Sequence, residues 1–391
     1  MPEDLVNPPA SEAPSPSAKS PLQEVASLMF RLGWTCFGGP AAHIALLREE
    51  TVTRRQWVDE QEFLDYLSLA GLVPGPTSTE VAIHLGYRRA GLAGLFAAGL
   101  CFTIPAVFLT TLIAAAYGAM QHLPAGLGML LGLKPAVIAV VARAVMGLIT
   151  PLKKRPWLLA LSAVAAAVYL LGAPVLPLLL GCGVVMLAGE WIPVRTGVIV
   201  PVPLVAAVVS SVADSERHVD AGSVFTYFLK LGATLIGSGY ALLAFMRADL
   251  VDRFHWLTEA QLLDAVAAGQ FTPGPVFSTA AFVGYLVGGP AGAIAGAAGI
   301  FLPAFFYVWI THPLARQLRR SPRASRFLDG VNAGSIGLIA GVLFQLATAA
   351  LTHIGAWLIF AGATLLLART RMNSAWVLLA AALIGWVTSR Q

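Results

Sequence analysis

Several ionisable side chains stand within stretches of the sequence that are otherwise apolar. Glu80 and His84 are spaced by one helical turn, and Lys134 and Arg143 fall in the apolar run 128–149. A charged residue at the centre of a membrane helix costs about 2.5–3.5 kcal/mol on insertion scales, and such residues are usually functional. Because a carboxyl buried away from water can take up a proton, Glu80 is the stronger candidate for a proton-carrying group. His84 suits a structural role equally well.

A backbone break followed by hydroxyl residues occurs twice. The residues of these two copies are Pro74, Gly75, Pro76, Thr77 and Ser78, and Pro273, Gly274, Pro275 and Ser278. Each proline removes a backbone donor and forces the chain out of helix. At membrane depth such a break is tolerated only where it is buried in protein or lines a cavity. The helix expected to restart at Thr77 has free N–H groups at its first turn, and a helix N-terminus attracts anions.

A second kind of predicted helix break, at glycine residues, follows a cationic residue in each half. Arg31 comes shortly before Gly38-Gly39, and Lys230 comes shortly before Gly237. The cations at membrane depth outnumber Glu80, and the helix N-termini add positive potential, so the pattern favours an anionic ligand. Snorkelling toward a nearby interface is the alternative for both cations, since each lies early in its segment.

The elements that would position these residues are duplicated. Arg31-Leu32-Gly33 matches Lys230-Leu231-Gly232 at an offset of 199, and the same offset pairs Trp57 with Trp256 and the two Pro-Gly-Pro turns. After one deletion the offset becomes 198. These matches predict two homologous halves. We expect a disordered Pro/Ser/Ala-rich tail at 1–21, a first repeat at 22–195, a linker at 196–221 and a second repeat at 222–391.

Each half has the same order of predicted segments. An interrupted helix comes first (22–47, broken at Phe37 to Pro40), then a polar stretch (48–62), then the broken hairpin around Pro-Gly-Pro. Four apolar spans follow in each half: 91–117, 128–149, 157–171 and 173–189, and then 290–311, 330–350, 353–368 and 373–388. The run 196–213 could supply an additional crossing, with a surface linker as the alternative. We expect an all-α polytopic membrane protein with roughly 12–13 membrane segments.

Composition agrees with a membrane location. Of 391 residues, 57% are hydrophobic and 12% charged, whereas a soluble domain carries about 25% charged residues. The net charge of +5 arises from short loops and gives no reason to expect nucleic-acid binding. Cys36, Cys101 and Cys182 fit no metal spacing and imply no disulfide framework. We expect neither a metal nor a cofactor.

Basic residues alternate between the halves. In the first half, two loops carry basic residues, Arg88-Arg89 and Lys153 to Arg155, and the equivalent loops of the second half hold no Lys or Arg. In the second half, two other loops carry basic residues, Arg316 to Arg326 and Arg369 to Arg371, and the equivalent loops of the first half hold none. By the positive-inside rule the two halves have inverted topology.

Inverted repeats with broken helices are typical of secondary transporters, whose ligand site lies near the midplane between the repeats. The alternative is a structural membrane protein in which Gly and Pro merely kink helices, although matched breaks in both halves are hard to explain by kinking. The chain has no Gly-rich nucleotide-binding loop ending in Lys-Ser/Thr, so ATP-driven pumping has no support.

The break Phe37-Gly38-Gly39-Pro40 and the turn Gly71 to Pro76 with its second copy resemble the chromate ion transporter family in its long, two-domain form, over about 25–388. The resemblance implies a non-enzymatic membrane protein that exports chromate across the bacterial inner membrane and confers chromate resistance. From the residues themselves we expect a binding site at Arg31, Lys134, Lys230 and the two kinds of break, with Glu80 and His84 in coupling, the bilayer as a partner and protons as a possible one. Gly237-Ser238-Gly239 and Thr279 depart from the first-half pattern, which suggests that the first half carries more of the coupling.

Two other functions stay open at this point. One is an exchanger of sulfate or another oxoanion with the same fold, because chromate is a tetrahedral dianion close to sulfate in shape. The other is an anion channel. A homodimer and the coupling ion are left open as well.

Overall fold

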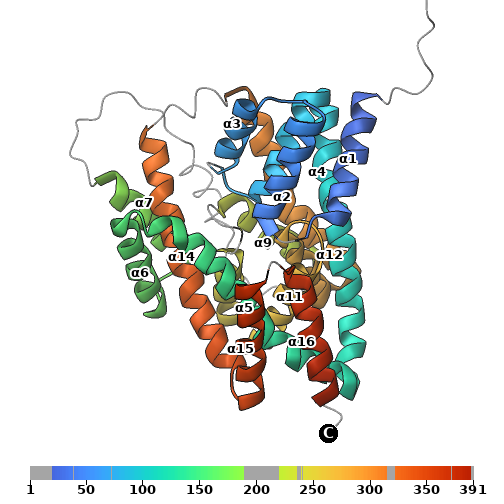
Figure 1. Cartoon of the computed structure of the whole chain (residues 1–391), viewed down its shortest axis with the longest axis vertical. Helices are drawn as coiled ribbons and strands as arrows, with labels where there is room; N and C mark the ends of the chain where they lie inside the picture. The colour runs from blue at the N-terminus through green and yellow to red at the C-terminus, as the bar shows by residue number, and fades with distance from the viewer. Residues whose placement is uncertain are drawn as a thin grey trace, which may run out of the picture.

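The computed structural model describes residues 20–37, 39–71, 73–188, 220–235, 239, 241–314, 322–370 and 372–388, and these residues form helices and turns without a strand (Figure 1). The predicted all-α polytopic fold is confirmed. Thr77–His122, Pro124–Leu152, Val276–Thr311 and Ser325–Ala350 are long and apolar enough to cross a membrane, and four shorter apolar helices accompany them. The additional crossing predicted at 196–213 lies outside the described residues, so the total of 12–13 stays a prediction.

The helices of the first half follow the predicted order. They are α1 (Pro21–Thr35), α2 (Gly39–Arg48), η1 (Glu49–Arg54), α3 (Glu60–Ala70), α4 (Thr77–His122), α5 (Pro124–Leu152), α6 (Pro156–Leu170) and α7 (Val175–Ala188). The chain breaks between α1 and α2, and α4 begins at Thr77, both where the glycine and proline patterns predicted.

The second half repeats this order. Its elements are α9 (Ala221–Thr234), α10 (Ala241–Met246), η2 (Arg247–Arg253), α11 (Glu259–Phe271), η3 (Val276–Ser278), α12 (Thr279–Thr311), η4 (His312–Leu314), α14 (Pro322–Ala350), α15 (Ile354–Arg369) and α16 (Ser374–Thr388). After the second Pro-Gly-Pro the chain forms one 3-10 turn, η3, before the α-helix starts at Thr279.

Unusual backbone conformations recur at equivalent positions of the two halves. Each half has a π-helical segment (η1 and η2), and each follows it with a non-glycine residue at positive φ, Gln56 at 51° and His255 at 54°. The long helices α4 and α12 each contain a sharp turn, at Gly91 (φ 61°) and Gly289 (φ 62°), after which the chain packs back on itself: Gly86 lies against Gly94, and Gly284 against Gly292. Conformations that are costly for the backbone seldom recur by chance, so the sequence duplication is also a structural one.

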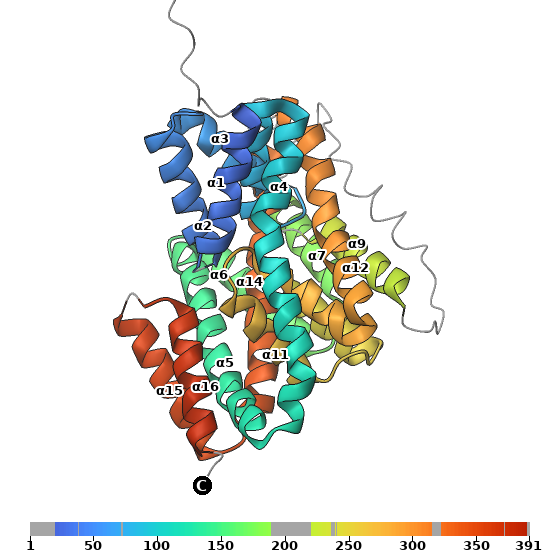
Figure 2. The same cartoon turned by 90° about the vertical axis from the view of Figure 1, so that its right-hand side faces the viewer.

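The two halves run in opposite directions and interlock. In Figure 2, the part of α4 after Gly91 descends to the lower end of the molecule, while the part of α12 after Gly289 rises beside it to the upper end. Helices α6 and α7 of the first half pack against α14 of the second, and α15 and α16 of the second half pack against α5 of the first. The arrangement is that of two inverted repeats, each of which supplies two helices to cover the other.

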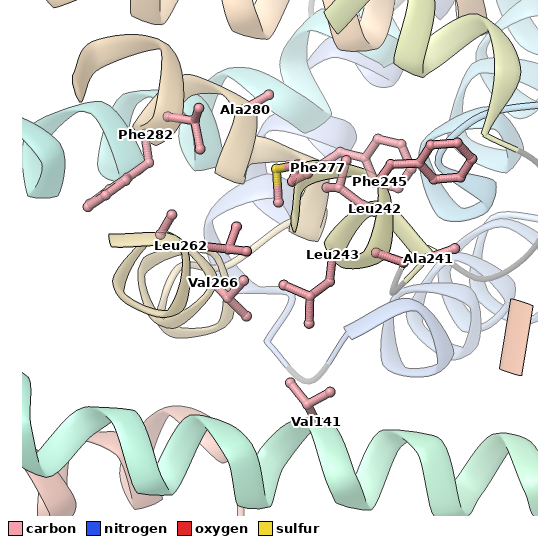
Figure 3. Close-up of a cluster of buried hydrophobic side chains, with 14 of the residues drawn as sticks. Val141, Ala241, Leu242, Leu243, Phe245, Leu262, Val266, Phe277, Ala280 and Phe282 are labelled. Atoms are coloured by element: carbon pink, nitrogen blue, oxygen red, sulfur yellow. The ribbon is translucent and has the colours of Figure 1, made fainter. Parts of the chain in front are cut away.

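The halves differ most at α3 and α11. Helix α3 buries Phe63, Tyr66, Leu69 and Ala70 and leaves its other residues more accessible, whereas every residue from Leu262 to Gln270 of α11 is buried. Helix α11 packs against α5, α12, α16 and α4, while α3 packs mainly against α4. Figure 3 shows part of the resulting apolar interior, where Leu262 and Val266 of α11 lie between Val141 of α5 and Phe282 of α12.

Candidate functional site: the crossed Pro-Gly-Pro turns

The two Pro-Gly-Pro turns each bind the other half of the protein. The Gly75 N–H donates to the carbonyl of Leu235, the residue that ends α9, at 2.9 Å. The Gly274 N–H donates to the carbonyl of Cys36, the residue that ends α1, also at 2.9 Å. An unpaired backbone group is costly away from water. The free N–H of each Pro-Gly-Pro turn is therefore paired with a free carbonyl at the end of the first helix of the other half.

Glycine is required at the centre of both turns. Gly75 has φ +140° and Gly274 has φ +95°, a range that L side chains rarely adopt. A Cβ on Gly75 would collide with Glu80 Oε1, and one on Gly274 would lie 2.8 Å from the Ala106 Cβ. The Glu80 carboxyl therefore lies against the backbone of the first turn.

Polar side chains without partners follow both turns. Glu80, Thr79 and Ser278 are fully buried, and none of their side-chain oxygens has a hydrogen-bond partner among the described residues. Thr79 and Ser278 stand at equivalent positions of the two halves. Buried polar groups normally have partners, so the turns hold unused hydrogen-bonding capacity where they meet.

The first turn is further held by a histidine. His43 Nε2 lies 3.1 Å from the Cys36 carbonyl oxygen, and His43 Nδ1 lies 3.2 Å from Ser78 Oγ. Since a carbonyl can only accept, Nε2 carries the proton and the neutral ring accepts from the Ser78 hydroxyl at Nδ1. His43 therefore joins the end of α1, which also binds the second turn, to the first turn of α4.

A histidine pair lies above Glu80, toward the bend of α4. His84 Nδ1 is 3.1 Å from Nδ1 of His312, at the end of α12. Tyr66 stacks on both rings at centroid distances of 5.1 and 5.2 Å. The cluster joins α3 and α4 of the first half to the last turn of α12.

Lys134 is placed in a separate polar cluster. Its Nζ lies 3.8 Å from Asp264 Oδ2, and the same oxygen accepts a 2.8 Å hydrogen bond from the Tyr117 hydroxyl. The Asp264 side chain is 2% exposed. This cluster connects α4, α5 and α11. Arg143, also on α5, donates to the backbone carbonyl of Leu367.

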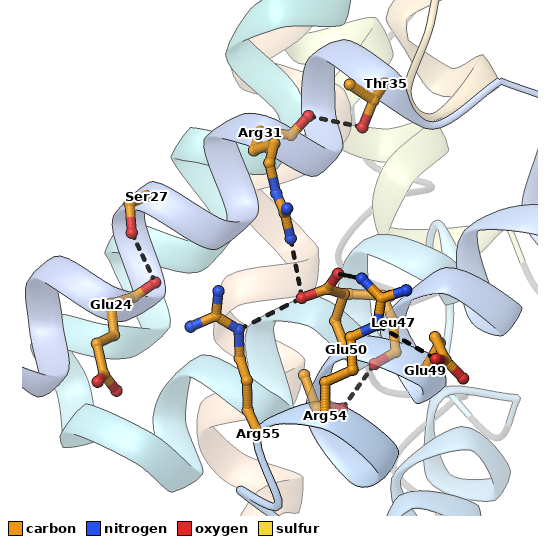
Figure 4. Close-up of polar contacts among 10 residues, drawn as sticks. Glu24, Ser27, Arg31, Thr35, Leu47, Glu49, Glu50, Arg54 and Arg55 are labelled. Carbon is orange, nitrogen blue, oxygen red and sulfur yellow. Dashed lines mark hydrogen bonds and ion pairs between the residues drawn. The ribbon is translucent and has the colours of Figure 1, made fainter.

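Arg31 lies in a charged cluster around η1. It forms an ion pair of 2.8 Å with Glu50, whose carboxylate also receives Arg54 and Arg55 (Figure 4). The Arg31 side chain is 52% exposed, and that of Glu50 is 8% exposed. The partner of Arg31 is thus an acidic residue of its own half.

Lys230 occupies the equivalent position beside a cavity of about 450 Å³. The charged residues that line this cavity come from α9 and η2: Lys230, Arg247, Asp249, Asp252 and Arg253. Its other wall is the turn between α6 and α7, including Tyr169 and Pro174. Lys230 and Asp249 correspond in sequence to the ion pair of Arg31 and Glu50.

The sequence predicted one site, but the structure divides its residues among several places. The structure brings the residues of the two turns together, with the ends of α1 and α9 beside them. These residues are Pro74, Gly75, Pro76, Thr77, Ser78, Glu80, Pro273, Gly274, Pro275 and Ser278. Gly39 opens α2 at φ +76°. Gly38 and Gly237 lie outside the described residues. Lys134, Arg31 and Lys230 each stand in another polar cluster.

The sequence reasoning missed His43, Tyr117 and His312, and it treated Asp264 only as a match to Asp65. The available signal was weak, because a histidine or tyrosine in an apolar helix is most often structural. Asp264 was the clearest case, since an acidic residue in an otherwise apolar helix needs a partner. Among the described residues no group of three or more His, Cys, Asp or Glu side chains could hold a metal ion.

Inverted halves with broken helices, and polar side chains where the breaks cross, define a polytopic membrane protein of the transporter class. The chain belongs to the chromate transporter family, whose model matches it twice, at residues 23–187 and 222–386. The long two-domain resemblance inferred from the sequence is thereby confirmed.

Curated relatives extend over nearly the whole chain. A chromate transport protein of Pseudomonas aeruginosa is 32% identical over an alignment of 401 positions, gaps included, which covers 97% of this chain and 95% of the relative. A chromate transport protein of Cupriavidus metallidurans is 31% identical, with 94% and 93% covered. A probable chromate transport protein of Synechococcus elongatus is 31% identical, with 86% and 88% covered. No solved structure matches the chain.

Proposed function

We propose that this protein is a secondary transporter that exports chromate across the bacterial inner membrane and thereby confers chromate resistance. The observation that carries the proposal is the crossing of the two Pro-Gly-Pro turns, with Glu80, Thr79 and Ser278 buried and unpartnered among the described residues. The family membership and the names of the relatives support chromate as the substrate.

The crossed turns suit a tetrahedral dianion. The N-terminus of α4 has no side-chain cap in the described structure, so its first N–H groups and the hydroxyls of Thr77 and Thr79 can serve as donors. The partial positive charge of a helix N-terminus offsets part of the dehydration cost of an anion. Ser278 adds a donor from the other half, so an anion bound here would contact both repeats.

Glu80 provides the coupling group in this proposal. Glu80 is a buried carboxyl beside the turns, so it can bind and release a proton next to the place where the anion would bind. Export driven by an inward proton gradient requires that the proton and the anion occupy the site in turn. Glu80 would bind a proton from the periplasm when the anion has left, and release it to the cytoplasm when the next anion is taken up.

The test is radiolabelled chromate flux into inverted vesicles. We expect saturable uptake that increases when the vesicle interior is made acidic and collapses with a protonophore. Uptake equal to that of vesicles lacking the protein would refute chromate transport.

Two alternatives are separated in the same vesicles. A sulfate or general oxoanion exchanger would take up sulfate as well as chromate, and each anion would compete with the other. An anion channel would show no saturation and no counterflow of labelled chromate against unlabelled chromate inside.

The proposed orientation has its own test. Cysteines introduced near Arg88 and near Arg320 should be labelled from the cytoplasm, and cysteines near Gly126 and Gly288 from the periplasm. Labelling of the sites near Arg88 and Gly288 from one side would contradict the inverted arrangement.

A further inference from the structure

The histidine pair joins the two halves at the basic end of the membrane region. His84 lies on α4 and is fully buried, while His312 lies at the end of α12 and is partly exposed. Their Nδ1 atoms are 3.1 Å apart, which is hydrogen-bonding distance. Two imidazole nitrogens facing each other can share only one proton, because one must donate and the other accept.

This pair continues the line of ionisable groups that begins at Glu80. His84 is one helical turn beyond Glu80, so the two side chains lie on one face of α4. The His84 Nε2 atom has no partner within the described part of the chain. Glu80 is buried, His84 is buried and His312 reaches partial exposure, so these groups lead from the crossed turns to the edge of the protein.

The surroundings of the pair are aromatic and charge-balanced. Tyr66 from α3 stacks on both rings, and Tyr87 from α4 packs on His312 at 4.4 Å between centroids. The charged groups that face the pair are Glu62 of α3 and Arg88 of α4, and these two are bonded to each other at 2.8 Å. The Tyr66 hydroxyl also donates to Glu62. An imidazole can accept a proton at one ring nitrogen and release one from the other, so the pair can pass a proton between its rings.

We infer that His84 and His312 form the proton path between Glu80 and the cytoplasmic side. This inference rests on the proposed proton-coupled function. A proton leaves the Glu80 carboxyl and reaches Nε2 of His84 through water, since the two groups are not hydrogen-bonded to each other. The proton on His84 Nδ1 moves to Nδ1 of His312, and the proton on His312 Nε2 passes to water. One proton enters and one leaves, and the starting tautomers return when each ring exchanges its proton with water before the next transfer.

The direction of the path agrees with the proposed transport. The bend of α4 carries Arg88 and Arg89 and is cytoplasmic by the positive-inside rule. A proton-driven exporter must release its proton on the side where it takes up its substrate, which is the cytoplasm. His312 stands on that side, in the second half, so proton release also depends on how the end of α12 sits against α4.

The test compares two assays on the same vesicles. His312→Phe keeps an aromatic ring for Tyr66 and Tyr87 but cannot carry a proton. We expect it to reduce proton-driven chromate uptake by about tenfold or more, the scale of a lost proton-transfer group. It should also flatten the dependence of uptake on pH. Exchange of labelled for unlabelled chromate at equal pH needs no net proton movement and should persist.

His84→Gln should have the same two effects, and His122→Phe is the matched control. His122 is exposed at the far end of α4, so its replacement should leave both assays unchanged. Proton-driven uptake of His312→Phe equal to that of the unmodified protein would overturn the relay while leaving chromate transport standing. Loss of both uptake and exchange in His312→Phe, with normal protein levels, would assign the ring to the substrate path instead and would also overturn the relay. Absence of chromate exchange in the unmodified protein would defeat the proposed function itself.

Discussion

The two halves make equivalent backbone hydrogen bonds at the crossed turns, but the side chains beside these turns differ. In the first half, His43 contacts Ser78, and Glu80 is buried without a partner among the described residues. The equivalent residues of the second half are Leu242, Phe277 and Thr279. Leu242 and Phe277 belong to the apolar interior shown in Figure 3, and the Thr279 hydroxyl bonds to the carbonyl of Val276 at 2.7 Å.

This difference separates the structural role of the turns from their chemical role. Both glycines donate to the opposite half with the same geometry, so the crossing needs two copies. The carboxyl next to the crossing belongs to the first half, because Thr279 stands in the second half at the position equivalent to Glu80. A pair of equivalent carboxyls so close together would repel each other when ionised. One coupling group between two matching turns avoids that cost.

The largest expected effect tests the part that the halves share. Gly75→Leu and Gly274→Leu should each reduce chromate flux about 100-fold or more, because both positions have a left-handed φ and no room for a side chain. Gly118→Leu is the control, since open space surrounds that helical glycine. Flux and membrane protein levels are measured together. If Gly274→Leu kept normal chromate flux, the second turn would not require glycine, and the halves would differ in backbone requirements as well.

The next effect tests the part that differs. Glu80→Gln should remove the dependence of chromate uptake on the proton gradient, a loss of about tenfold in driven flux, while Thr279→Val should leave that dependence intact. The measurement is uptake into inverted vesicles with and without an imposed pH difference. A gradient effect that survives Glu80→Gln would move coupling to another residue.

A smaller effect concerns the ion pair between Lys134 of the first half and Asp264 of the second. The second half has Asn332 at the position equivalent to Lys134, so the symmetry-related pair cannot form. Lys134→Gln leaves the Asp264 carboxylate buried without its cation, which costs about 3 kcal/mol on the scale of broken buried pairs. We expect lower thermal stability in detergent and weaker chromate flux. Lys134→Gln combined with Asp264→Asn should recover most of the stability. If the combined variant is as unstable as the single one, the two side chains do not act as a pair.

The smallest effect concerns the charged cluster around η1, outside the membrane-spanning helices. Burial opposes ionisation of Glu50, but the charge of Arg31 and the hydrogen bonds from Arg55 and Arg31 hold the pKa of Glu50 below its usual value. A lowered pKa in the folded state stabilises the protein above the ordinary value of about 4.3, and this contribution is lost as the pH falls through the lowered pKa.

Removing this cluster should therefore matter most at neutral pH. Arg31→Gln and Glu50→Gln should each lower stability by about 1 kcal/mol or less at pH 7, since the arginine is largely exposed. They should lower it less at pH 3, as measured by thermal unfolding in detergent. Arg31→Gln should also slow chromate flux less than Lys134→Gln does. A larger loss of flux, with unchanged stability, would instead favour direct contact of Arg31 with the anion.

Local sequence signals predicted the breaks well. Proline removes a backbone donor and glycine permits positive φ wherever they occur, so the ends of α1 and the start of α4 followed from the residues themselves. Internal repetition gave the duplication, because matching residues can be aligned without knowing any contact. The opposite directions of the halves followed from the loop charges.

Contacts between distant residues were beyond this kind of reasoning. His84 and His312 are separated by 228 positions, and Tyr117 and Asp264 by 147. Depth in an apolar run suggested that Arg31 and Lys134 stand near the turns, but the structure places an acidic partner beside each. The chain alone does not reveal which of several buried charges will neutralise one another, because that depends on how the halves are packed.

The exchange of outer helices between the halves affects how the protein is made. Helices α6 and α7 are synthesised well before α14, the helix against which they pack. Ser162 of α6 reaches its hydrogen-bond acceptor, the carbonyl of Ala333, only after 171 further residues have followed. The surface of α6 and α7 that packs against α14 is therefore exposed to lipid until the second half has been synthesised and inserted. Assembly is completed only then. Substitutions on these faces should consequently reduce the yield of assembled protein rather than its rate of transport.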